Sequence, residues 1–320
     1  FFLPISGIQQ KLLAVAVLAF ILVMNVISTK CGGVIQILAT VGKLIPVIAI
    51  ICFGLFSGAA PGAAGMEAPQ AGAGFGVAIL GTLWAYDGWI SVTNMAGELK
   101  NPAKTLPRVI SFGVAAVILI YALFNVAIFK ILPLDVVAVS STPGAQAAEV
   151  LFGKGGGIFL TAGIMVSVFG ALNGYLMTAA RVPQAMGERD QLPFSRVLGR
   201  VHPRLRTPAN ALIFQSLLAV VYIFSGTFNT LTDLLVFVLW IFFTMGVFGV
   251  FLLRRKNPPQ EGRYRVPLYP ITPIVGIVGG IYILISTIVS DPVRSLIGIL
   301  ITLVGLPVYF YKNRNRKKEA

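Results

Sequence analysis

The chain is a series of long hydrophobic runs separated by short polar connections. Nine of the runs have about the 20 residues that a helix needs to cross the roughly 30 Å hydrocarbon core of a bilayer. They lie at residues 12–28, 34–57, 75–97, 108–131, 157–180, 209–225, 231–253, 269–289 and 294–311. The runs are continuous, whereas transmembrane barrels show alternating segments, and only helices satisfy their own backbone polar groups in lipid. The pattern predicts an all-α integral membrane protein with about nine transmembrane helices.

Lysine and arginine are concentrated in alternate connections. Of the 25 basic residues, twenty lie on one side of the predicted membrane, four on the other, and Lys43 lies inside a run. The four are Lys11, Lys130, Lys154 and Arg294. Because short basic connections stay in the cytoplasm, this asymmetry predicts a multi-pass protein of the plasma membrane with a cytoplasmic carboxyl terminus, including a basic tail at 312–320.

The composition excludes other classes of protein. Hydrophobic residues make up 57% of the chain and charged residues 11%, whereas a soluble fold has roughly 25% charged residues. The net charge of +14 sits in short loops beside the membrane, where it contacts anionic lipid heads, so we expect no nucleic acid partner. With two cysteines, one histidine and no P-loop or hydrolase motif, we expect no metal ion, no cofactor and no enzymatic activity.

Lys43 is a charged residue within the second hydrophobic run. It lies about nine residues, or ~13 Å, from the cytoplasmic start of that run. A lysine at such depth costs at least ~2.5 kcal/mol unless it finds water or a polar partner. Snorkelling is the alternative, but the lysine stem covers only about half of that distance. We therefore expect an interior lysine whose partners are carbonyls or hydroxyls of a broken helix.

An Asp87-Gly88 pair lies near the middle of the third run, flanked by Trp84, Tyr86 and Trp89. Asp-Gly is a turn signal, and an irregular backbone survives at membrane depth only where it lines a cavity. The pair predicts a discontinuous helix with free carbonyls that can accept from an ammonium group and aromatic side chains that close over a solute. The alternative is an ordinary helix with a tolerated glycine and an interfacial aromatic cluster, although these aromatics lie about ten residues into the run.

Small residues form one surface of the fifth run, and they are Ser167, Gly170, Ala171, Asn173 and Gly174. Membrane helices use such surfaces to approach one another closely, so packing alone explains the pattern. A functional alternative is that Ser167 hydrogen-bonds to Lys43. The connection at 132–156 is long and apolar enough to fold over the membrane face as a lid.

Several motifs occur in order across about 300 residues. They are WAYDGW (84–89), ELKNPAKTLPR (98–108), SVFGALNG (167–174), an R…GERDQLP run (181–193), HPRLRTP (202–208), YRVPLYP (264–270) and GLPVYFY (305–311). With these motifs the chain resembles the amino acid/polyamine/organocation (APC) transporter superfamily. The resemblance is to its L-amino acid transporter branch, which includes bacterial serine/threonine exchangers.

The resemblance implies the LeuT-type inverted-repeat fold, in which broken helices meet at the midplane. The chain is similar to family helices 4–12, which predicts an amino-terminally truncated chain, because nothing matches the broken first helix that binds the substrate carboxylate. Residues 1–57 would then be a remnant of the first repeat and 75–253 the second repeat. Residues 266–311 would form two peripheral helices.

The resemblance also implies roles for individual residues. Lys43 matches a lysine whose ammonium replaces a sodium ion, and Ser167 matches a serine near that lysine. Trp84 matches an aromatic gate, and Trp240 falls where aromatic residues border the pocket. The expected substrate-binding residues are Leu83, Trp84, Ala85, Tyr86, Asp87, Gly88 and Trp240.

These implications predict an amino-acid permease that moves neutral L-amino acids by alternating access, without sodium, as an exchanger or a proton-coupled carrier. A polyamine or cationic amino-acid carrier is an alternative that requires an acidic pocket, for which Asp87 is the candidate. A non-transporting truncated or sensor-like membrane protein is another. The cysteine that bonds mammalian members to an accessory glycoprotein would precede Phe1, and the alanine- and glycine-rich composition argues against such a partner.

Overall fold

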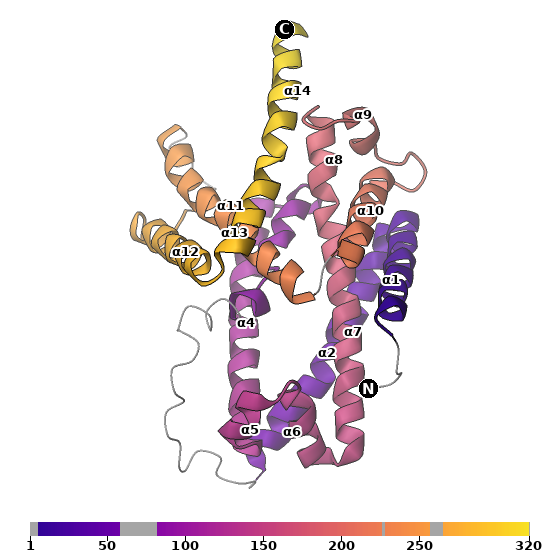
Figure 1. The fold of residues 1–320 in the computed structure, drawn as a ribbon, viewed down its shortest axis with the longest axis vertical. Helices are drawn as coiled ribbons and strands as arrows, with labels where there is room; N and C mark the ends of the chain where they lie inside the picture. Colours follow the sequence, from indigo (N-terminus) through magenta and orange to yellow (C-terminus); the bar gives the residue numbers. More distant parts are fainter. Residues whose placement is uncertain (1–5, 58–81, 226–227, 257–264, 320) are drawn as a thin grey trace. The chain divides into compact units, whose positions relative to one another are not determined.

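The computed structural model describes residues 6–57, 82–225, 228–256 and 265–319, which are helical with short connections and contain no β-strand (Figure 1). Seven helices in these ranges are long and apolar enough to cross a membrane. They are Gly7–Ile27, Lys30–Phe56, Pro102–Ile131, Lys154–Glu188, Leu234–Lys256, Ile271–Ser290 and Pro292–Lys312. The run at 209–225 is the shorter apolar helix Ala209–Ser225, and the run at 75–97 begins outside the described residues. The prediction of an all-helical membrane protein is confirmed.

The chain divides into two compact units. The first comprises residues 1–70, 111–180 and 201–216, and the second 71–110, 181–200 and 217–320. The first unit contains α1 (Gly7–Ile27), α2 (Thr29–Phe56), most of α4 (Pro102–Ile131), α5 (Leu134–Val139), α6 (Pro143–Phe152), α7 (Lys154–Ala179) and the start of α10 (Ala209–Ser225).

The antiparallel pair of α2 and α7 is the centre of the first unit (Figure 1). Small residues of α7 lie against α2 along its length. Gly163 packs on Pro46, Gly170 on Ala39 and Gly174 on Gln36. Without side chains at these positions the two backbones approach closely, which is how helices gain van der Waals contact in lipid. The predicted small-residue surface is therefore a helix-packing surface.

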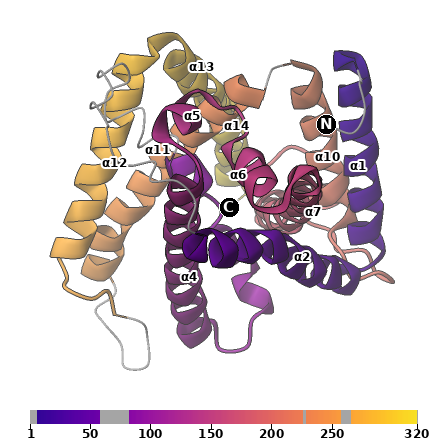
Figure 2. The same cartoon turned by 90° about the horizontal axis from the view of Figure 1, so that it is seen from below.

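The connection at 132–156 folds back over one end of the first unit as α5 and α6 (Figure 2). Pro143 occupies the first turn of α6, where a proline costs no hydrogen bond, and Gly153 ends the helix with a φ of 72°. Ala147 and Ala148 of α6 are fully buried in a cluster that also contains residues of α2, α4 and α7. The segment is thus firmly packed on the unit that it covers.

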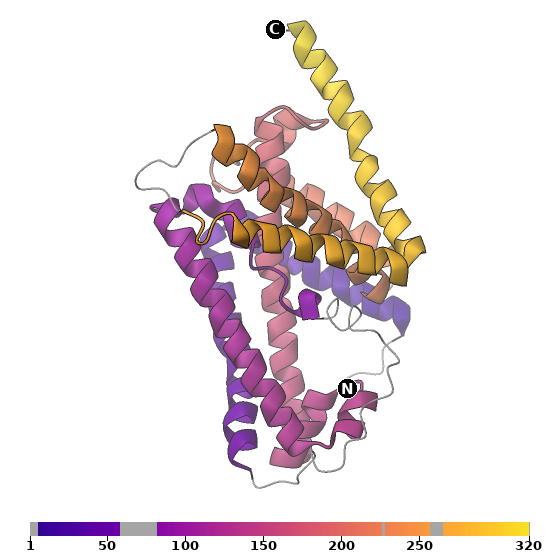
Figure 3. The same cartoon turned by 90° about the vertical axis from the view of Figure 1, so that its left-hand side faces the viewer.

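The second unit contains η1 (Ser91–Glu98), α8 (Arg181–Glu188), α9 (Ser195–Leu198), α11 (Phe228–Lys256), α12 (Ile271–Ser290), α13 (Pro292–Leu303) and α14 (Gly305–Glu319). Helix α11 packs against α12 and α13, and Figure 3 shows α11 beside α12. Glycines again permit the contacts, since Gly280 of α12 lies on Thr244 and Gly298 of α13 lies on Phe237.

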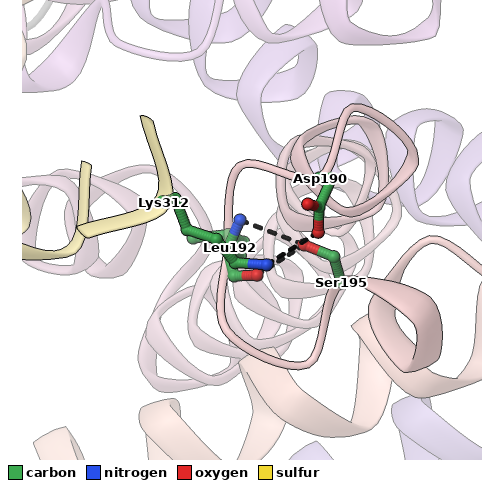
Figure 4. Close-up of polar contacts among 4 residues, drawn as sticks. All are labelled: Asp190, Leu192, Ser195 and Lys312. Carbon is green, nitrogen blue, oxygen red and sulfur yellow. Dashed lines mark hydrogen bonds and ion pairs between the residues drawn. The ribbon is translucent and has the colours of Figure 1, made fainter. Parts of the chain in front are cut away.

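The carboxyl-terminal helix α14 is tied to the turn that follows α8. Lys312 Nζ forms an ion pair with Asp190 Oδ1 at 2.7 Å (Figure 4). The turn itself is closed by Ser195, whose hydroxyl donates to the Leu192 carbonyl and accepts from the Leu192 amide. This ion pair positions the last described helix within the second unit.

Candidate functional site

The helix that carries WAYDGW is interrupted, as the sequence predicts. Residues 82–85 are α-helical, residues 86–90 form turns, and the 3₁₀ helix η1 begins at Ser91. The Tyr86 amide still donates to the Thr82 carbonyl at 3.1 Å, but the Asp87 amide donates to Trp84 instead of Leu83. The Leu83 carbonyl therefore receives no α-helical hydrogen bond from Asp87. A carbonyl released in this way at membrane depth is a potential acceptor for a ligand.

Gly88 makes the interruption possible because its φ is 104°. A side chain with a Cβ is sterically excluded from most of this region, so glycine is required at this turn. The eight residues of η1 that follow are a long run for a 3₁₀ helix, whose hydrogen-bond geometry is poorer than that of an α-helix. The segment from Tyr86 to Glu98 therefore has weaker backbone support than the α-helices of this unit.

Aromatic residues of α11 lie beside the interruption, within the same unit. The Phe243 ring lies 5.8 Å from the Trp89 ring and 6.0 Å from the Trp240 ring, centroid to centroid. The structure thus links Trp240 to the broken helix through Phe243. Phe243 is not among the predicted site residues, and it lies three residues after Trp240, on the same helix face. Trp84 and Trp89 are each 44% exposed, so both indoles have accessible surface.

The far end of η1 is held by an ion pair. Glu98 Oε1 lies 2.6 Å from Arg181 Nη2, and the Arg181 side chain is only 16% exposed. Arg181 Nη1 also donates to Gln184 Oε1 at 3.1 Å, which keeps the guanidinium in place. Both residues belong to the motifs that carry the family resemblance, but nothing in those motifs indicates that the two side chains pair.

Lys43 and Ser167 lie at the same level of the α2–α7 pair. Lys43 is between Ala39 and Pro46, both of which contact α7, and the adjacent Gly42 lies against Val166. Within the described residues, Lys43 has no hydrogen bond or ion pair, and the Lys43–Ser167 hydrogen bond of the sequence hypothesis is not formed. Helix register brings the two residues to one level, but hydrogen bonding requires a closer approach of the two side chains.

A buried amide cluster joins three helices of the first unit, and it lies nearer to the start of α2 than Lys43 does. Asn173 of α7 is fully buried, and its Nδ2 donates to the Gly32 carbonyl at 2.9 Å and to Gln36 Oε1 at 3.2 Å, both on α2. Its Oδ1 accepts from Asn25 of α1 at 2.8 Å. Asn25 also donates to the Ile21 carbonyl at 2.9 Å. The sequence singled out Asn173 but gave no signal for Asn25 or Gln36 as its partners.

The predicted site residues therefore fall into two groups, each within its own unit. Lys43 and Ser167 belong to the first unit, and Trp240 and residues 83–88 belong to the second. Across the described ranges, no three His, Cys, Asp or Glu side chains are grouped to hold a metal ion. Residues 83–88 and Trp240 place polar backbone groups beside aromatic side chains. This combination suits a small zwitterionic solute.

Comparison with known proteins gives consistent matches along the chain. A family model described as "Amino acid permease" matches residues 1–307. The serine/threonine exchanger SteT of Bacillus subtilis is 42% identical over 306 residues, which cover 95% of this chain and 70% of SteT. The mouse b(0,+)-type amino acid transporter 1 is 32% identical over 317 residues, or 95% of this chain and 63% of that protein.

More distant similarity extends to the human cystine/glutamate transporter, which is 28% identical over 311 residues. The match covers 96% of this chain and 61% of that transporter. The chain thus spans less than two thirds of the length of these two mammalian relatives.

Proposed function

Because the chain belongs to the amino acid permease family, we propose that it forms the greater part of a carrier that exchanges neutral L-amino acids across the plasma membrane. The carrier works by alternating access, without sodium. Its carboxyl terminus lies in the cytoplasm, as the distribution of basic residues indicates. In this proposal residues 1–57 end the first inverted repeat, 75–253 form the second, and 266–311 are peripheral.

The observation that carries the proposal is the interrupted helix at Asp87-Gly88. Its first half ends at carbonyls, including that of Leu83, that can accept from the ammonium group of an amino acid. Trp84 lies on this half and closes the outer path over the bound solute. In this proposal the substrate carboxylate is bound by the broken first helix of the family fold, for which this chain has no matching motif.

Lys43 supplies the positive charge that a sodium ion brings in related carriers. Its depth in α2 and its level opposite Ser167 on α7 support this role. Because this ammonium group is part of the protein, the carrier needs no bound sodium ion. Substrate binding alone then drives the change between the outward-open and inward-open states. Neutral substrates are favoured by the 42% identity to a serine/threonine exchanger.

The test is exchange by the purified full-length carrier in liposomes loaded with unlabelled serine, threonine or leucine. Radiolabelled serine is expected to accumulate only when the liposomes contain an unlabelled neutral amino acid, and equally well with or without sodium. Excess threonine is expected to compete, whereas arginine and putrescine are not. If arginine or putrescine inhibits serine exchange and threonine does not, the neutral substrate class is overturned. If the protein exchanges no amino acid at all, the proposed function is overturned.

A Lys43→Ala variant tests the role of the lysine in the same assay. It is expected to lose most of the exchange activity while inserting normally into the membrane. The matched control is Lys130→Ala, which removes an exposed lysine whose Nζ donates to the Leu55 carbonyl at 2.8 Å. Unchanged exchange by Lys43→Ala would contradict the proposed role.

A further inference from the structure

Phe243 lies between two tryptophans that come from different elements of the second unit. Its ring packs on Trp89, the residue that directly follows Gly88 of the interrupted helix, and on Trp240, which is one helical turn away on α11. The contact with Trp240 is edge-to-face, with an interplanar angle of 70°, and that with Trp89 is tilted at 56°. Both arrangements are favourable for aromatic rings.

The other contacts of α11 fix the helix that presents Phe243. Phe237 is 3% exposed and lies against Gly298 of α13. Thr244 lies against Gly280 of α12, and its hydroxyl donates to the Trp240 carbonyl at 2.7 Å. Since α12 and α13 hold α11, Phe243 is a fixed support, whereas Trp89 sits on a turn of irregular backbone.

We propose that Phe243 is a positioning residue that sets the size limit for the substrate side chain, by holding the indoles of Trp89 and Trp240 as one aromatic wall. This inference rests on the proposed function, because it concerns the same site. The interrupted backbone binds the polar end of the amino acid, and the three-ring wall bounds the space left for its side chain. Loss of the Phe243 ring frees the Trp89 indole to rotate and enlarges that space.

The expected effect is a change in selectivity at nearly constant turnover. In Phe243→Ala, the KM for serine rises about tenfold because a small side chain loses its contact with the wall. The KM for leucine stays the same or falls, since the enlarged space accommodates its side chain. The kcat for both substrates changes little, because a wall that contacts substrate throughout the cycle contributes uniform binding.

The experiment measures KM and kcat for serine and leucine exchange in liposomes with four proteins. They are the wild type, Phe243→Ala, Phe243→Tyr and the control Phe242→Ala. Phe242 is the neighbouring residue on α11, is 50% exposed, and makes no ring contact within the described part of the chain. Phe243→Tyr keeps the ring and is expected to retain the wild-type serine-to-leucine ratio of KM values, as is Phe242→Ala.

Tryptophan fluorescence provides a second readout, because all three tryptophans of the sequence, Trp84, Trp89 and Trp240, belong to the candidate site. Serine is expected to change the emission of the wild type and of Phe242→Ala. Phe243→Ala is expected to start from a red-shifted emission and to require about tenfold more serine for the same change. If Phe243→Ala does not insert into the membrane, Phe243→Leu replaces it, since it removes the ring but keeps most of the volume.

The outcomes separate this inference from the proposed function. A wild type that exchanges no amino acid refutes the proposed function. A wild type that exchanges serine, together with a Phe243→Ala or Phe243→Leu variant that keeps the wild-type KM ratio and emission, refutes the role of Phe243 alone. The role of Phe243 would also be overturned if Phe242→Ala changed the serine-to-leucine ratio of KM values equally, because the effect would then not depend on the three-ring wall.

Discussion

Replacing Asn173 by alanine tests whether the buried amide cluster holds the first unit together. The substitution removes three interhelical hydrogen bonds, to Asn25 at 2.8 Å, to the Gly32 carbonyl at 2.9 Å and to Gln36 at 3.2 Å. Interhelical bonds in membrane proteins are worth about 0.6 kcal/mol on average and up to about 1.7 kcal/mol. The three bonds of Asn173 therefore contribute roughly 2 to 5 kcal/mol.

Asn25→Ala removes only one of these interhelical bonds, so its expected cost is about 0.6–1.7 kcal/mol. The double variant is expected to cost less than the sum of the two single variants, because both remove the same Asn25–Asn173 bond. Asn125→Ala is the matched control. Asn125 is exposed on α4, and its amide donates to the Tyr121 carbonyl of its own helix at 2.8 Å.

The assay is thermal unfolding of each variant in detergent, followed by the loss of monodisperse protein in size-exclusion chromatography. Asn173→Ala is expected to lower the midpoint by about 3 to 7 °C. The midpoint of Asn25→Ala should lie between those of Asn173→Ala and the wild type, and the midpoint of Asn125→Ala should equal that of the wild type. The reasoning is refuted if Asn173→Ala melts at the same temperature as the Asn125→Ala control.

Gly163→Ala is expected to weaken the α2–α7 contact by about 1–3 kcal/mol, because the added Cβ would overlap a proline ring of α2. Gly155→Ala on the same helix meets open space, and equal melting temperatures for the two variants would contradict the packing argument. Arg181→Gln removes the ion-pair partner of Glu98, which is itself 46% exposed, and is expected to cost about 0.5–1 kcal/mol in the same unfolding assay. The exposed Arg189 serves as the control, and an Arg189→Gln variant that is equally destabilised would show that the ion pair contributes nothing specific.

The sequence was sufficient for features that depend on composition and local chemistry. Long apolar runs predict helices because lipid offers the backbone no other partner. The interruption at Gly88 was predictable because an Asp-Gly pair favours a turn wherever it occurs. Gly170 and Gly174 indicated close helix packing in the same way, since the absence of a side chain is itself the signal.

Features that depend on which helices meet were not predictable from one sequence. Asn25 and Asn173 are 148 positions apart, and nothing local to either residue indicates that they hydrogen-bond. The same holds for Glu98 and Arg181, which look like ordinary loop charges until the fold pairs them. In the sequence Phe243 cannot be distinguished from the other apolar residues of α11, because a contact between aromatic rings leaves no pattern beyond hydrophobicity.

The central claim is that the turn at Gly88 is the amino-acid site, and equilibrium binding of serine to purified protein tests it most directly. Gly88→Ala places a Cβ at a φ of 104°, and the resulting strain of about 1–3 kcal/mol is expected to distort the turn and weaken binding by about tenfold or more. Gly113→Ala on α4, where an added Cβ meets open space, is expected to bind like the wild type. Wild-type affinity for serine in a folded Gly88→Ala variant would contradict the account.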